Sequence, residues 1–157
     1  QQLQKKLLSI GEESGNRVVA MIRTYCAVAS AHAHFPQRVV DDLRMMYSDT
    51  YNRLRSFHSG FLPALLSSNI ESGISAKLYK ESFDSDIMAE LLINQLNYLW
   101  RKPDGLSDTM LPGRIRQQFL QHFMWGITTP AGKSLAVDYF SGRPSLAGLN
   151  LVNTEIE

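Results

Sequence analysis

The histidines are the side chains of this sequence whose type and spacing come nearest to doing chemistry. His32 and His34 stand two residues apart, a spacing that places side chains on one face of a strand but about 200° apart on a helix. The pair falls at the end of a helical pattern, and no third ligand follows at a metal-binding spacing. His58 and His122 are isolated, which is typical of a partly buried or interfacial helix histidine. We therefore expect no metal site.

Residues 126–134 read Gly-Ile-Thr-Thr-Pro-Ala-Gly-Lys-Ser, which at first looks like a phosphate-binding loop. That motif needs four residues between its glycines and follows a strand, whereas here five residues intervene and a helical pattern precedes them. The alternative is structural. One helix ends at Gly126 and the next begins at Thr129 and Pro130, because proline suits the first helical turn. We therefore expect no nucleotide site here.

Cys26 and the acidic residues give no support for catalysis. Cys26 lies among apolar residues of a helical pattern and has no histidine at a recognisable spacing, which predicts a buried, inert thiol. No acidic residue is spaced from a histidine as in a di-iron helical bundle, and no Ser-His-Asp signature is present. The sequence therefore predicts a protein that is not an enzyme and needs no cofactor.

The composition is that of an ordinary globular chain and fits a single domain. Of its 157 residues 44% are hydrophobic, and 16 Lys and Arg stand against 15 Asp and Glu, a net charge of +1. Balanced charge argues against this chain by itself holding a nucleic-acid backbone, because such domains carry a basic excess. No apolar run is long enough to cross a bilayer, so we expect no membrane partner. A single cysteine suits a reducing compartment, so we expect a cytoplasmic protein.

Apolar residues recur with the 3.6-residue period of a helix along most of the chain. The clearest case begins with Val18, Met21, Ile22 and Tyr25, which form a wide apolar stripe. No stretch alternates as a strand does, so the sequence predicts an all-α bundle of six or seven helices. Residues 1–8 are expected to be the end of a helix, and further helices are expected at 16–33, 37–46, 49–72, 84–101, 114–127 and 130–140. Pro63 predicts a kink near 59–63 within the helix at 49–72. We expect a loop at 102–112 and a loosely ordered tail from residue 141.

Capping residues set the expected ends of three of these helices. Ser14 or Asn16 can cap the helix that contains Val18, and Asp84 stands where its carboxylate can cap the helix that follows it. Gly73 is the expected end of the long helix before that one, since glycine is favoured just past a helical C-terminus.

Two features of the apolar residues go beyond a plain core. Six Met, seven Phe, six Tyr and two Trp are spread over the helices. Such side chains line adaptable ligand cavities, although a stripe of them is more often core. The helices at 84–101 and 114–127 keep Asn, Gln, Tyr and His beside apolar residues, a mixture that suits a subunit interface. A four-helix bundle shared by two chains would bury both helices.

Three passages carry a resemblance to a known family. Residues 42–54 are similar to its short helix, tyrosine-containing turn and following long helix. Residues 69–89 follow its passage of isoleucine, glycine, a basic or aromatic residue, an acidic cap and the next helix. Residues 119–132 resemble its final interface helix and the glycine-rich turn after it. Over residues 15–140 the chain resembles the C-terminal, ligand-sensing and dimerising domain of the tetracycline-repressor (TetR) family of bacterial transcriptional regulators.

The resemblance implies a division of the chain and a set of partners. It makes 1–13 the end of an inter-domain linker helix, 14–140 the sensing and dimerisation domain, and 141–157 a loosely ordered tail. The family's N-terminal helix-turn-helix has no counterpart here, so operator DNA would be bound by a domain ahead of Gln1 that this chain lacks. The expected partners are a second copy of the chain and a small, mostly apolar effector. The alternative is a free-standing helical binding or adaptor domain without a DNA-binding part.

Helical phase, combined with the resemblance, gives the expected site residues. The effector would lie between the helices at 15–33, 49–72 and 84–101. Its expected lining consists of Met21, Tyr25, Met46, Phe57, Phe61, Met88 and Gln95. The expected dimer interface consists of Leu91, Tyr98, Phe119, His122 and Phe123.

Overall fold

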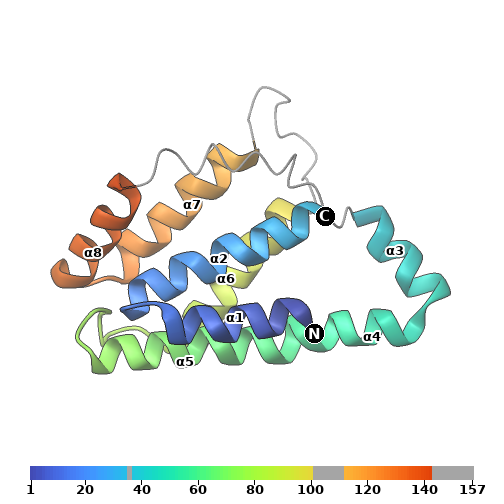
Figure 1. The fold of residues 1–157 in the computed structure, drawn as a ribbon, viewed down its shortest axis with the longest axis horizontal. Helices are drawn as coiled ribbons and strands as arrows, with labels where there is room; N and C mark the ends of the chain where they lie inside the picture. Colours follow the sequence, from blue (N-terminus) through green and yellow to red (C-terminus); the bar gives the residue numbers. More distant parts are fainter. Residues whose placement is uncertain (35–36, 101–111, 143–157) are drawn as a thin grey trace.

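The computed structural model describes residues 1–34, 37–100 and 112–142 (Figure 1). The expected loop at 102–112 and the tail beyond 142 fall almost entirely outside them. The described residues form α1 (Gln2–Glu13), α2 (Arg17–His34), α3 (Gln37–Met46), α4 (Ser48–Ser56), the π-helical segment η1 (Phe57–Phe61), α5 (Leu62–Ser75), α6 (Ser85–Trp100), α7 (Pro112–Ile127) and α8 (Pro130–Ser141). Since α4, η1 and α5 follow one another without a break, these residues make seven helical rods and no strand. The predicted all-α bundle is confirmed.

Helix α2 lies at the centre of the bundle, because its apolar stripe is wide enough to face several neighbours. It contacts α1, α5, α6, α7 and α8. Val18, Met21, Ile22 and Val28 have no exposed surface, and Tyr25 is also buried. Helix α5 packs along α6 on one side of this core, and α7 and α8 lie together on another (Figure 1). Burial of these side chains supplies the main stabilisation of the bundle.

Helix α3 lies at the edge of the fold. It contacts chiefly α4 and stands at one end of the molecule in Figure 1, away from α8. Its C-terminal Met45 and Met46 are 82% and 73% exposed. Val40 anchors it, being buried. Helix α3 is therefore positioned by few apolar contacts.

The predicted interruption before Pro63 takes the form of a π-helical turn. Proline has no backbone N–H and its ring crowds the preceding turn, so a regular α-helix cannot pass through it unchanged. The turn at η1 widens instead, and the Leu62 N–H donates to the Phe57 carbonyl, five residues back. The rod regains α-helical geometry at Leu62, with Pro63 in its first turn.

Two predicted caps are confirmed. The Asn16 Oδ1 accepts a hydrogen bond of 2.9 Å from the Val19 N–H at the start of α2. The Asp84 Oδ1 accepts from the N–H groups of Asp86 and Ile87, each at 3.0 Å, at the start of α6. Both side chains satisfy N–H groups that the first helical turn leaves without a partner.

Gly73 was expected to end its helix, and this prediction is wrong, because α5 continues to Ser75. The left-handed residue that follows the helix is Lys77, with φ of 59°. The Gly73 carbonyl accepts from the N–H groups of Leu78 and Tyr79, and the Tyr79 ring lies directly against Gly73, where a Cβ would clash. Glycine is needed there for close packing, not for its conformational freedom.

The segment that looks like a phosphate loop is a helix cap, as the structural alternative predicts. Thr129 is the N-cap of α8, and its Oγ1 accepts from the Gly132 N–H. The same hydroxyl donates to the Lys77 carbonyl at 2.8 Å, which ties the start of α8 to the end of α5. Helix α7 ends at Ile127, one residue beyond the glycine expected to stop it.

A helix that crosses a membrane must be both long and apolar, and none of the described helices meets both conditions.

Candidate functional site

Among the described residues, helix α6 borders a hollow on each of two faces. One is polar and lies between α6, α3 and the rod formed by α4 and η1. The other is mainly apolar and lies between α6 and α7. Asn94 lines both hollows, at the boundary between the two faces.

The first hollow, which we call the polar pocket, has a volume of about 400 Å³. Most of its lining side chains are charged or can form hydrogen bonds. They are Asp41, Arg44, Tyr51, Arg55, His58, Ser59, Glu90, Asn94 and Asn97, with apolar contributions from Val40, Leu54 and Ile93. A volume of this size accommodates a small organic molecule.

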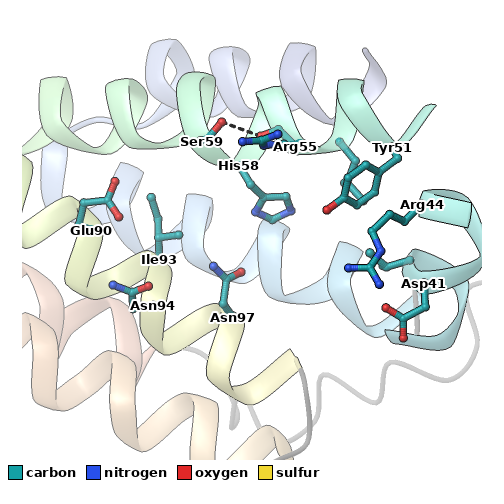
Figure 2. Close-up of a pocket in the computed structure, with 12 residues that line it drawn as sticks. Asp41, Arg44, Tyr51, Arg55, His58, Ser59, Glu90, Ile93, Asn94 and Asn97 are labelled. Atoms are coloured by element: carbon teal, nitrogen blue, oxygen red, sulfur yellow. Dashed lines mark hydrogen bonds between the residues drawn. The ribbon is translucent and has the colours of Figure 1, made fainter. Parts of the chain in front are cut away.

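Four polar side chains converge on the pocket from four elements (Figure 2). Arg44 enters from α3, Tyr51 from α4, His58 from η1 and Asn97 from α6, and all four point into the space between them. The π turn places His58 here, since the wider turn alters the direction of its residues relative to a regular helix. The Ser59 hydroxyl donates to the Arg55 carbonyl at 3.0 Å, so it is already engaged within the rod.

Behind His58 lies a second histidine, on α2. The rings of His32 and His58 have centroids 5.1 Å apart and are tilted by 32°. Burial lowers the pKa of His32 to about 3, assisted by electrostatic repulsion from His58, when that ring is protonated, and from Arg116. Burial also lowers the pKa of His58. Both rings are therefore neutral at pH 7, and a neutral imidazole carries one donor and one acceptor.

The second hollow, which we call the apolar groove, has a volume of about 490 Å³. Its walls are the facing sides of α6 and α7. Its lining consists of Phe83, Met88, Leu91, Asn94, Gln95, Tyr98, Phe119, His122, Phe123, Gly126 and Ile127. Leu91 is 48% and Tyr98 53% exposed, and Ile87, one helical turn before Leu91, is 57% exposed. These side chains give the α6 side of the groove an exposed apolar surface.

The structure brings all five expected interface residues to the apolar groove. Leu91 and Tyr98 of α6 and Phe119, His122 and Phe123 of α7 all line it. Phe123 is also buried in the core, so its contribution to a further contact is smaller than that of the others. The mixed polar and apolar faces seen in the sequence are thus adjacent in space.

The seven expected effector residues lie in four different places, and none lines the polar pocket. Met21 and Tyr25 are core residues, and the Tyr25 hydroxyl donates to the Arg116 carbonyl at 3.3 Å. Phe57 and Phe61 stack on each other, with centroids 5.7 Å apart, and pack against the core. Met46 is exposed at the end of α3. The remaining two, Met88 and Gln95, line the apolar groove.

The sequence does not predict the residues of the polar pocket, because nothing in it distinguishes them from other polar residues. Arg44, Tyr51 and Asn97 lie far apart along the chain and follow no motif. One weak signal was available: Asn94 and Asn97 are three residues apart, so two amides share one face of α6. The helix packing that brings them opposite Arg44 cannot be seen in the sequence.

Cys26 is partly buried and packs against the core. In the three described segments, no group of three or more His, Cys, Asp or Glu is placed to hold a metal ion.

Comparison with known proteins gives no relative. No protein-family model matches the sequence, no curated protein matches it, and no solved structure matches the fold.

Proposed function

We propose that this chain is the effector-binding and dimerisation domain of a transcriptional regulator that resembles the TetR family. One observation supports this proposal above the others: α6 forms a wall of the polar pocket and a wall of the apolar groove at once. A sensor domain needs such an element, because a ligand must alter the contacts between subunits through the protein that lies between them.

The apolar groove suits a second copy of the same chain. A dimer formed about a two-fold axis would place α6 and α7 of one copy against α6 and α7 of the other, as a shared four-helix bundle. Covering Leu91, Tyr98 and Ile87 would remove exposed apolar surface from water, which favours association. Asn94 and His122 would supply polar contacts beside them.

The polar pocket suits the effector. Its walls come from α6, which also lines the groove, and from α3, which has few core contacts of its own. A ligand that draws α3 toward α6 would favour one position of these helices over another. It would change the dimer to the extent that its affinity differs between those positions.

DNA recognition is assigned to another part of the same protein. The chain has a net charge of +1, too small for a surface that neutralises several phosphates. By the resemblance, this part is a helix-turn-helix ahead of Gln1, and the protein acts on operator DNA in the cytoplasm of a bacterium. A dimer would then read a site with two-fold symmetry.

The proposal is tested with the protein expressed from its complete reading frame. The purified protein is used to select bound sequences from a random double-stranded DNA library. We expect enrichment of a two-fold symmetric site, with half-sites about one helical turn apart or a multiple of it. No enriched sequence, together with a monomeric mass in light scattering, would contradict the proposal and favour the adaptor function, in which the groove holds a helix of another protein.

A further inference from the structure

The charges around the polar pocket define the class of molecule that fits it. Arg44 and Arg55 contribute two positive charges, and Asp41 and Glu90 two negative ones. Asp41 already has an interaction within the chain, and Figure 2 shows Glu90 at the opposite end of the pocket from Arg44. In the half of the pocket that contains Arg44, Tyr51 and His58, the charges of Arg44 and Arg55 stand against that of Asp41 alone, which leaves an excess of positive charge.

Arg44 supplies the guanidinium on the α3 side of this half, near Asp41 (Figure 2). Its guanidinium points from α3 toward the space between His58 and Asn97 (Figure 2). Within residues 1–34, 37–100 and 112–142 it forms no salt bridge and no side-chain hydrogen bond. A guanidinium presents a planar fork of donors that matches both oxygens of a carboxylate.

The neighbouring groups are neutral and can bind the rest of such a ligand. Asn94 and Asn97 offer amides with both donors and acceptors, and Tyr51 offers a hydroxyl. The lowered pKa of His58 keeps its imidazole neutral, so it adds no charge. Val40, Leu54 and Ile93 provide a small apolar wall for the ligand's carbon skeleton.

Building on the proposed function, we infer that the effector is a small carboxylic acid with further hydrogen-bonding groups, and that Arg44 binds its carboxylate. Its hydroxyl or amide groups would bind Tyr51, His58 and Asn97. This class differs from the mostly apolar effector expected from the sequence, because the side chains that line the pocket are mainly polar.

The inference is tested with pairs of probes that share a shape but differ in charge. Suitable pairs are 4-hydroxybenzoate with 4-hydroxybenzamide and hippurate with hippuramide, together with benzylamine as a cation. Binding is measured by saturation-transfer NMR and by titration of chemical shifts. We expect at least one acid to bind at least about tenfold more tightly than its amide, since a hydrogen bond to a charged group is stronger than one to a neutral group.

Two variants assign the effect to Arg44. Arg44→Gln removes the charge from an exposed position, so we expect an unchanged fold by circular dichroism and at least about tenfold weaker binding of the acid. Arg53→Gln is the matched control: it removes an exposed arginine of α4 that does not line the pocket, and binding should stay as in the wild type.

The other outcomes are equally informative. If the amide or benzylamine binds as tightly as the acid, the ligand class is wrong while a sensing pocket remains. If the acid binds equally well to Arg44→Gln, the assignment of Arg44 is wrong. If no acid, amide or amine binds at millimolar concentration, both the ligand class and the sensing role of this pocket are overturned.

Discussion

The polar pocket and the apolar groove share helix α6 but are constructed in different ways. The groove lies between two regular helices that follow one another in the chain, α6 and α7. The pocket brings together a peripheral helix, a π turn and the other face of α6. Under the proposed function, association would use a surface between two regular helices, whereas the ligand would contact a peripheral helix and an irregular turn. Elements with few buried contacts are the ones that open and shift most readily.

The same contrast explains how a signal could pass through the domain. Asn94 borders both hollows, and Ile93 beside it is buried in the core. A small rotation of α6 that improves contacts in the pocket would also change the surface that the groove presents. Coupling of this kind acts in both directions, so dimer formation would alter ligand affinity by the same factor.

The largest expected effect is on dimerisation, and it should follow mutation of the groove face of α6 but not of the pocket face. Leu91→Glu places a carboxylate on the groove face, where Leu91 is exposed enough for the monomer to fold. Dimerisation would bury two such unpaired charges, which costs several kcal/mol, so we expect the dimer to dissociate about a thousandfold more readily. Sedimentation equilibrium measures this constant. Asn97→Glu, on the pocket face, should leave it unchanged, and equal weakening by both variants would erase the distinction between the faces.

The second prediction locates acid sensitivity on the pocket side. Burial lowers the pKa of His32 to about 3 in the folded chain, whereas an exposed histidine has a pKa near 6.5. Between these two values His32 is mostly protonated in the unfolded chain and neutral in the folded chain. The free energy of unfolding should therefore fall as the pH drops from 7 to 5, by about 2 kcal/mol for His32. Urea unfolding of the wild type and His32→Gln at both pH values measures this, and a loss of equal size in the variant would contradict it.

The smallest expected effect concerns the π turn. Deleting Gly60 removes the extra residue of η1 and should restore a regular helix, which withdraws His58 from the pocket. The ligand would then lose its hydrogen bond to His58, so we expect the best carboxylate probe to bind about tenfold more weakly. The dissociation constant of the dimer should stay unchanged. Gly60→Ala keeps the length of the turn, and its Cβ would meet no atom within 4 Å, so it serves as the control. Unchanged affinity after the deletion would show that the π turn does not position His58.

Much of the fold follows from local properties of the sequence. The period of the apolar residues predicts each helix, and the caps at Asn16 and Asp84 are predicted by short-range chemistry. Gly73 was misassigned because its small size is needed by the ring of Tyr79, a tertiary contact. The lining of the polar pocket could not be predicted for the same reason. It depends on where α3 and α4 stand relative to α6, and their apolar stripes do not specify that.

The central claim is that one face of α6 associates with a second chain while another face lines the ligand pocket. Amide hydrogen exchange, compared between the wild type at high concentration and Leu91→Glu, tests it most directly. We expect slower exchange in α6 and α7 of the wild type than of the variant, and equal exchange in α3 and α4. Light scattering of the wild type should give a mass of twice 17.7 kDa. Equal exchange rates throughout, or slower exchange confined to α3 and α4, would contradict the account.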